Sequence, residues 1–187
     1  MTKPWVALFS QTGSEIIKLS EHLNRFPDRI FTNNKDVNSW HPTMRNVHND
    51  GLKSKFGESC ITIVNKTKSK SCNFLHTIDK TSLVTLHGWL RIIPENICEY
   101  YNIVNGHPGL INTYPELKGK DPQVRAYDNE YGVIGSVVHK VTPIVDDGEI
   151  LSYTAIYRQP EDQLDDIFEK LSFTSFKSWQ KFFRTIK

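Results

Sequence analysis

The chain is poor in cysteine and has no spacing that would bind a structural metal. Its three cysteines, Cys60, Cys72 and Cys98, are widely separated, odd in number and form no Cys-x-x-Cys pair. Structural zinc sites and disulfide frameworks use closely spaced or even-numbered cysteines. We therefore expect a protein of a reducing, cytoplasmic compartment that needs neither a disulfide nor a metal.

Long apolar runs, an excess of charge of one sign and dinucleotide-binding glycines are also missing. No apolar stretch reaches the length of about 20 residues that a membrane-spanning helix needs, and the N-terminal residues show no secretory pattern. The formal net charge of +2 creates no strong field for nucleic acid or an anionic membrane. No Gly-x-Gly-x-x-Gly occurs, which argues against a dinucleotide binder. We expect neither nucleic acid nor a membrane as partner.

The order of apolar segments predicts an α/β fold. The chain opens with the apolar run 5–9, which predicts a strand buried in a parallel sheet. A turn containing Gly13 follows, and then a helical pattern for which Thr12 or Ser14 is the expected N-cap. Residues 35–58 show no clear period and are expected to be loop with one short helix. The basic stretch 66–71 is expected to be an exposed turn. Further strands are expected at residues 29–32, 60–64, 82–86, 101–104, 135–141 and 150–157, followed by helix from residue 161. We predict a single domain, residues 1–187, with a Rossmann-like, doubly wound and mostly parallel sheet flanked by helices.

The stretch from Asn105 to Leu110, Asn-Gly-His-Pro-Gly-Leu, is the central candidate site. It follows the expected strand 101–104, and residues two apart in an extended segment point to the same side. Asn105 and His107 would then face one reacting atom, the amide as an oxyanion donor and the ring as a proton carrier. The alternative is an ordinary junction between strand and loop with a capping Asn and a surface His.

Other polar groups follow other expected strands. They include Gly13-Ser14-Glu15, the segment 88–91 and Asp146. Ligands of open parallel sheets bind at the carboxyl ends of the strands. A carboxylate such as Asp146 orients an imidazole ring and raises its pKa. Asn105, His107 and Asp146 together are a set suited to acyl transfer.

Taken in order, several motifs resemble the folate-dependent formyltransferases, most closely the compact branch that serves purine biosynthesis. The resemblance extends from Val6 to about Phe183. Its motifs are Phe9-Ser10-Gln11-Thr12-Gly13-Ser14, Gly88-Trp89-Leu90-Arg91-Ile92-Ile93-Pro94, Asn105-Gly106-His107-Pro108-Gly109-Leu110, Tyr114-Pro115, Leu117-Lys118-Gly119, Gly135-Ser136-Val137-Val138-His139 and Asp146-Asp147-Gly148-Glu149-Ile150. Each motif alone is weak, whereas the ordered set is specific.

The resemblance implies the reaction and the role of each matching residue. An amine would attack the formyl carbon of the cosubstrate 10-formyltetrahydrofolate, without a metal. Asn105, His107 and Asp146 would be catalytic; Asp146 is chosen over Asp147 because the family places its Asp two residues before the Gly. His139 would support them, and a plain buried His is the alternative there. Folate would bind at Leu90, Arg91, Ile92, Ile93, Val145 and Asp146, and the acceptor at Gly13, Ser14 and Glu15.

Two departures from the family pattern bear on the acceptor. Glu15 stands where the purine enzymes have Asn, and a carboxylate there opposes a phosphate. Gly106 stands where Ile is usual, so a looser strand tip is expected. The acceptor is thus glycinamide ribonucleotide or another small amine, such as an amino sugar or a modified nucleotide. A hydrolase that releases formate and an inactive folate- or nucleotide-binding module are alternatives, and the protein is expected to be a monomer or a homodimer.

Overall fold

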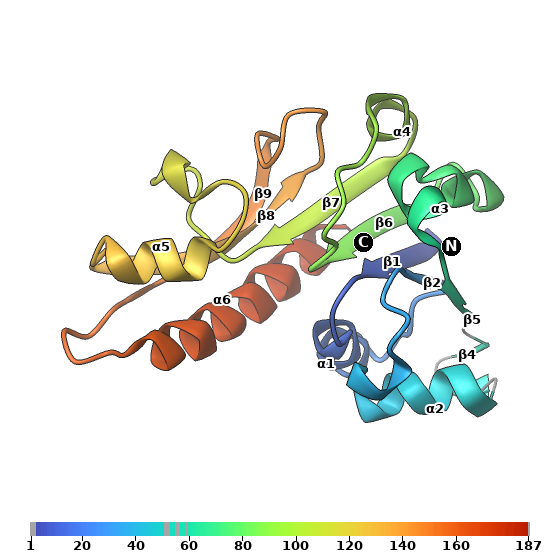
Figure 1. Cartoon of the computed structure of the whole chain (residues 1–187), viewed down its shortest axis with the longest axis horizontal. Helices are drawn as coiled ribbons and strands as arrows, with labels where there is room; N and C mark the ends of the chain where they lie inside the picture. The colour runs from blue at the N-terminus through green and yellow to red at the C-terminus, as the bar shows by residue number, and fades with distance from the viewer. Residues whose placement is uncertain (1–2, 51–52, 55–56, 59, 187) are drawn as a thin grey trace. The chain divides into compact units, whose positions relative to one another are not determined.

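The computed structural model describes residues 3–50, 53–54, 57–58 and 60–186 (Figure 1). Its main sheet has seven strands in the order β5-β2-β1-β6-β7-β8-β9. The pairs β1–β2, β1–β6 and β2–β5 are parallel, and β8–β9 is antiparallel. The predicted fold class, a mostly parallel sheet flanked by helices, is confirmed. The chain divides after Val104, within β7, into two compact units.

The first unit comprises Met1–Val104. Its strands are β1 (Trp5–Phe9), β2 (Arg29–Thr32), β5 (Cys60–Ile63), β6 (Leu83–His87), the start of β7 (Asn102–His107) and a separate pair of β3 (Lys53–Ser54) with β4 (Gly57–Glu58). Its helices are α1 (Ser14–Leu23), α2 (Pro42–Asp50), α3 (Lys66–Ser71), α4 (Glu95–Tyr100) and the 3₁₀ turns η1 (Val37–Ser39) and η2 (Asn73–Thr77).

Strand β1 is the centre of this unit because parallel strands lie on both of its edges. All five of its residues are buried, as expected for a strand covered on both faces. Ala7 and Phe9 belong to a core cluster with apolar residues of α1 and α2. Phe31 of β2 contacts Phe74 of η2, with ring centroids 4.6 Å apart. Apolar packing on the sheet therefore fixes the strand ends from which the α1 turn and the loop after β6 emerge.

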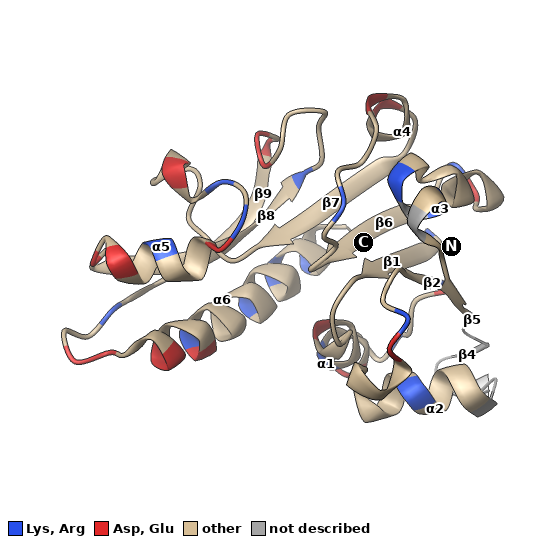
Figure 2. Cartoon of the chain, in the orientation of Figure 1, with Lys and Arg blue, Asp and Glu red and all other residues tan. Residues whose placement is uncertain are grey.

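The second unit comprises Asn105–Lys187. It contains η3 (Pro115–Leu117), α5 (Pro122–Asp128), β8 (Val133–Lys140), β9 (Ile150–Tyr157) and α6 (Leu164–Thr185). The acidic residues of α6 lie in its first turns, and the basic residues follow toward its C-terminal end (Figure 2). At 22 residues α6 is long, but neither it nor any other helix in the described ranges is both long and apolar enough to cross a bilayer.

Helix α6 is tied to β8 by apolar packing and by buried hydroxyl groups. Ile167 and Leu171 of α6 share a core cluster with Ile134 and Val137 of β8. The Ser136 hydroxyl group contacts the Leu171 carbonyl at 3.0 Å, so the strand and the helix are held in one register.

Two expectations about helices are wrong. The N-cap of α1 is Gly13, in a left-handed conformation without a side-chain cap, and neither Thr12 nor Ser14. The basic stretch Lys66–Ser71 is helix α3, because the Asn65 side chain accepts a hydrogen bond from the Lys68 N–H and caps it.

One strand boundary differs from the prediction, and one expected helix is present. The segment 35–58, expected as loop with one short helix, contains the nine-residue helix α2, although part of that segment lies outside the described residues. Strand β7 continues to His107 and does not end at Val104. Pro108 directly follows, and its missing N–H prevents further pairing. Both Asn105 and His107 therefore belong to a strand.

Candidate active site

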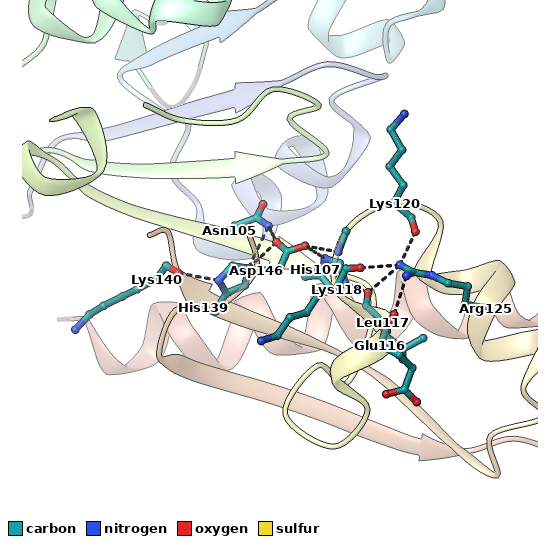
Figure 3. Close-up of polar contacts among 11 residues, drawn as sticks. Asn105, His107, Glu116, Leu117, Lys118, Lys120, Arg125, His139, Lys140 and Asp146 are labelled. Atoms are coloured by element: carbon teal, nitrogen blue, oxygen red, sulfur yellow. Dashed lines mark hydrogen bonds and ion pairs between the residues drawn. The ribbon is translucent and has the colours of Figure 1, made fainter. Parts of the chain in front are cut away.

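Strand β7 presents Asn105 and His107 on the same side, as their spacing predicts (Figure 3). His107 is buried, with 5% of its surface exposed, and Asn105 is half-buried. The Gly109 N–H bonds the His107 carbonyl at 2.9 Å, which closes the turn directly after the strand. The two side chains are therefore held by regular backbone and not by a mobile loop.

Asp146 meets both of these side chains. Its Oδ2 atom lies 3.3 Å from His107 Nδ1, and its Oδ1 atom accepts a hydrogen bond from Asn105 Nδ2 at 3.4 Å. Its side chain is 11% exposed. Asp146 adopts a left-handed conformation, with φ of 52°, in the turn between β8 and β9, a conformation that Asp tolerates better than most residues. The structure thus brings the three predicted catalytic residues together.

His139, predicted as a supporting residue, belongs to the same cluster. Its Nε2 atom lies 3.2 Å from Asn105 Nδ2 and 3.4 Å from Asp146 Oδ1. Its Nδ1 atom donates to the Lys140 carbonyl at 2.8 Å, because a carbonyl can only accept. This bond fixes the plane of the ring at the end of β8. His139 therefore limits where both the amide and the carboxylate can lie.

The segment from Leu117, the last residue of η3, to Gly119 contacts two of the candidate catalytic groups. His107 Nε2 lies 2.9 Å from the Leu117 carbonyl, and the Gly119 N–H donates to Asp146 Oδ2 at 2.9 Å. Leu117 O accepts only, and so does the carboxylate of Asp146, so each nitrogen of the His107 ring faces an acceptor. Only a doubly protonated ring could donate to both acceptors, whereas a neutral ring, with one N–H, donates to one of them at a time.

Arg125 is a residue of this region that the sequence did not reveal. Its guanidinium group donates to the carbonyls of Glu116 at 2.7 Å, Leu117 at 3.2 Å and Lys118 at 2.9 Å, and also contacts the Lys120 carbonyl (Figure 3). One side chain of α5 therefore gathers the loop that carries the Leu117 and Gly119 contacts. An isolated Arg in a helix carries no sequence signal for such a role.

Burial and charge act in opposite directions on the His107–Asp146 pair. Burial lowers the pKa of His107, although the carboxylate of Asp146 and the Leu117 carbonyl oppose this shift. Burial alone would raise the pKa of Asp146, but the contacts with His139, His107 and the Gly119 N–H outweigh it and lower the pKa to about 2. Asp146 is therefore ionised at neutral pH and can receive or orient a proton of the His107 ring.

The cluster combines an amide donor, an imidazole ring and a carboxylate, which can polarise a carbonyl group and move a proton. The amide nitrogen of Asn105 already faces His139 and Asp146, at distances longer than the usual 2.9–3.0 Å of a hydrogen bond. Its N–H groups can therefore change partners when an oxygen atom of a substrate approaches. Among the described residues, no group of three or more His, Cys, Asp or Glu side chains could hold a metal ion.

The residues predicted to bind the acceptor lie in the first unit, at the start of α1. Gly13 is the N-cap and Ser14 is half-buried. The Glu15 carboxylate has a partner in this unit, because its Oε2 atom lies 2.7 Å from His87 Nδ1. His87 is the last residue of β6 and was not among the predicted site residues.

The loop predicted to bind folate is also in the first unit. The side chains of Leu90 and Ile92 are exposed, whereas that of Ile93 is buried, so Ile93 can offer only its backbone to a ligand. The Leu90 N–H donates to the Ser10 hydroxyl at 2.9 Å, which fastens this loop to the end of β1. In the second unit Val145, the other predicted folate contact, is exposed beside Asp146.

Comparison with known proteins identifies the family of the chain. The profile of the formyl transferase family matches residues 53–179. A phosphoribosylglycinamide formyltransferase of Bacillus subtilis is 30% identical over 99 residues, which cover 52% of this chain and 48% of the relative. A formyltetrahydrofolate deformylase of Synechocystis sp. is 28% identical over 89 residues, 47% of this chain and 30% of the relative. The chain thus matches less than half the length of these two relatives.

Solved structures share the fold over almost the whole chain. The phosphoribosylglycinamide formyltransferase of Campylobacter jejuni is 22% identical, with a TM-score of 0.75 and 98% of both chains covered. That of Streptococcus pneumoniae is 21% identical, with a TM-score of 0.74, 99% of this chain and 98% of the other covered. Because the family profile matches more than half of the sequence, the chain belongs to the formyl transferase family.

Proposed function

We propose that the protein transfers a formyl group from 10-formyltetrahydrofolate to the amine of a small acceptor, with Asn105, His107 and Asp146 as the catalytic residues. The observation that carries the proposal is the position of the Asp146 carboxylate, which is 11% exposed and lies 3.3 Å from His107 and 3.4 Å from Asn105. Family membership and the names of the relatives support the same reaction class.

In the proposed reaction the acceptor nitrogen attacks the formyl carbon and forms a tetrahedral intermediate. The Asn105 amide and the protonated ring of His107 stabilise its oxyanion. The bond between the formyl carbon and N10 of the folate then breaks, and N10 takes up a proton in exchange for the one that the amine loses. Asp146 pairs with the His107 ring and passes this proton, directly or through a water molecule. His139 holds the carboxylate and the amide in position.

The binding roles follow the residues' chemistry and exposure. The exposed apolar side chains of Leu90, Ile92 and Val145 suit an aromatic ring system, and Arg91, Ile93 and Asp146 complete the proposed folate contacts. Gly13, Ser14 and Glu15 would bind the acceptor. Glycinamide ribonucleotide, an amino sugar and a modified nucleotide are candidate acceptors. We further propose one catalytic domain, residues 1–187, acting in the cytoplasm as a monomer or a homodimer.

The reaction is tested by incubating the protein with 10-formyltetrahydrofolate and a panel of amines while the absorbance of the folate is followed. We expect turnover with at least one amine and its loss in His107→Ala. Absence of turnover with every amine, or a rate that His107→Ala leaves unchanged, would contradict the proposal. Normal folate binding without any turnover would instead favour an inactive folate-binding module.

Hydrolysis of the same folate is a second candidate function. The observation in its favour is that curated relatives from Synechocystis sp. and Arabidopsis thaliana are formyltetrahydrofolate deformylases. Water would replace the amine as nucleophile, and formate would replace the formylated product. Quantifying formate with and without an amine separates the two reactions, because a transferase releases little formate once its acceptor is present.

A further inference from the structure

Glu15 and His87 form a pair at the edge of the first unit where β1 and β6 end. Glu15 Oε2 lies 2.7 Å from His87 Nδ1, and because a carboxylate only accepts, Nδ1 carries a proton. The last residue of β1, Phe9, lies beside His87 in the parallel register. The turn that follows β1 leads into α1, in which Glu15 is the second residue. The pair therefore joins two neighbouring strand ends.

The histidine of this pair is anchored in the core. His87 is 4% exposed, and its Nε2 atom contacts the Thr85 hydroxyl group at 2.9 Å. Thr85 also accepts a hydrogen bond from Trp5 Nε1 at 2.8 Å, and both residues are buried. The contact with Thr85 therefore fixes the plane of the His87 ring, and the ring in turn holds the Glu15 carboxylate in position. This distinguishes the pair from a surface ion pair, whose partners are mobile.

The position of the pair matters for ligand binding. In α/β folds the turn between the first strand and its helix is the usual place for a phosphate, because the free N–H groups and the helix dipole attract an anion. Here the Ser14 N–H is bonded to Thr12 Oγ1 at 3.2 Å. Glu15, in the first turn, already places a negative charge at this end of α1. A phosphate at this turn would be repelled by the negative charge of Glu15, and the Ser14 N–H would not be free to donate to it.

We propose that this turn accepts hydrogen bonds from a hydroxyl group of the acceptor, and that the acceptor is a hydroxyl-bearing amine without a phosphate at this position. The inference rests on the proposed function, in which Gly13–Glu15 binds the acceptor. The Glu15 side chain is 27% exposed, so a ligand can reach it while His87 holds it. A carboxylate only accepts hydrogen bonds, and a hydroxyl group is a neutral donor that it can bind without repulsion between like charges. This chain and the relatives named for a phosphoribosyl substrate would then catalyse the same kind of formyl transfer, but to different acceptors.

The test compares two ligands that differ only in the phosphate, glycinamide ribonucleotide and glycinamide riboside. Binding of each to the full chain is measured by isothermal titration calorimetry without folate, so that no turnover is needed. The key variant is Glu15→Gln, because its amide oxygen still accepts from His87 Nδ1 while the negative charge is removed. We expect the wild type to favour the riboside. In Glu15→Gln the affinity ratio should shift toward the ribonucleotide by about tenfold or more, since a like charge beside the phosphate is gone.

Glu21→Gln is the matched control, because Glu21 is exposed on the same helix and the substitution changes the net charge equally. It should leave the affinity ratio within about twofold, as expected for a distant surface charge. Thermal unfolding of both variants checks that they fold. Glu15→Asn, which is too short to keep the contact with His87, provides a second way to remove the charge.

A wild type that binds the ribonucleotide at least as tightly as the riboside would overturn the inference. The inference is also overturned if both Glu15 variants change the affinity ratio no more than Glu21→Gln does. The same holds if neither ligand binds to any of the proteins. A separate formyl-transfer assay tests the reaction itself. Absence of transfer in a protein that still favours the riboside counts against the proposed reaction and not against the ligand preference of this turn.

Discussion

The indole ring of Trp179 occupies the space beside Gly106 that a side chain would need. A Cβ atom on Gly106 would lie 2.5 Å from Trp179 Nε1 and 2.9 Å from Cε2. Trp179, in α6, is fully buried. The expectation that Gly106 loosens the strand tip is therefore wrong, because the tip of β7 lies directly against this ring. Asn105 and His107, on either side of Gly106, are supported by the same contact.

Replacing Gly106 by Ala should destabilise the second unit by about 1–3 kcal/mol, because a methyl group would force a buried indole ring to move. Formyl transfer should fall as well, since Asn105 and His107 move with the strand. Urea unfolding and the transfer rate measure the two effects. Gly132→Ala is the control, because a Cβ atom there meets nothing within 4 Å, and it should change stability by less than about 0.5 kcal/mol.

A double variant tests the cause of this effect. Trp179→Phe removes the part of the ring that contacts Gly106, so Gly106→Ala should cost less in that background than in the wild type. An equal cost in both backgrounds would show that Trp179 is not the reason why position 106 requires glycine.

Asp146→Asn should lower kcat by about 10²- to 10⁴-fold, the usual range for loss of a group that transfers a proton. The amide keeps nearly the same shape but cannot stabilise a protonated His107 ring. The KM for the folate should change much less than kcat. Asp147→Asn is the matched control, because Asp147 is exposed and pairs with Lys118 at the surface. A larger loss in Asp147→Asn than in Asp146→Asn would reverse the assignment.

Arg125→Met should release the loop that carries the Leu117 and Gly119 contacts. The carbonyls that Arg125 binds would lose a charged donor, which is worth about 1.5–3 kcal/mol for a single hydrogen bond. We expect kcat to fall by about tenfold as the ring of His107 loses its fixed orientation. Hydrogen exchange at the Gly119 N–H should become faster, because its bond to Asp146 weakens.

Arg184→Met serves as the control for this loop prediction. Arg184 is exposed near the end of α6, and its replacement removes the same charge. Unchanged exchange at Gly119 in Arg125→Met would mean that the loop keeps its shape without the guanidinium group.

The free energy of unfolding should decrease below neutral pH. Burial lowers the pKa of His107 below its ordinary value of 6.5, so the unfolded chain binds a proton before the folded one does. Stability is then lost as the pH falls below 6.5, by at most about 1.4 kcal/mol per pH unit. Asp146, whose pKa is lowered from 3.8 to about 2, adds a loss of the same sign at lower pH. Urea unfolding at a series of pH values measures the slope.

His107→Gln should reduce the slope between pH 6.5 and 5, because a neutral side chain replaces the titrating ring. His22→Gln, at an exposed position of α1, removes a histidine from the surface. If both variants flatten the curve equally, the pH dependence does not arise from the buried ring.

Much of the fold was predictable because it follows from local patterns. The apolar run 5–9 could be satisfied only by a strand covered on both faces, and it forms β1. Ile150–Tyr157 was expected as a strand and is β9. Helix α3 was missed because a polar, basic segment has no apolar period, and its cap, Asn65, is a residue that also starts turns.

The candidate cluster was predictable in part. The spacing of Asn105 and His107 placed both side chains on one side of a strand, and the family pattern chose Asp146. The structure added the backbone groups of Leu117 and Gly119, which no sequence pattern marks because every residue has a carbonyl and nearly every one an N–H. Arg125 was missed for a related reason, since its partners are carbonyls brought to it by the turn after η3.

The sequence alone determined most of the strands, the presence of a carboxylate at the first turn of α1 and the amide and imidazole two residues apart on β7. Only the tertiary structure decided that Glu15 meets His87, 72 residues later in the chain, and that Trp179 fills the space beside Gly106. The physical reason is that periodicity and residue type specify which face of an element is buried. They do not specify which distant side chain covers it, because that depends on how the whole chain packs.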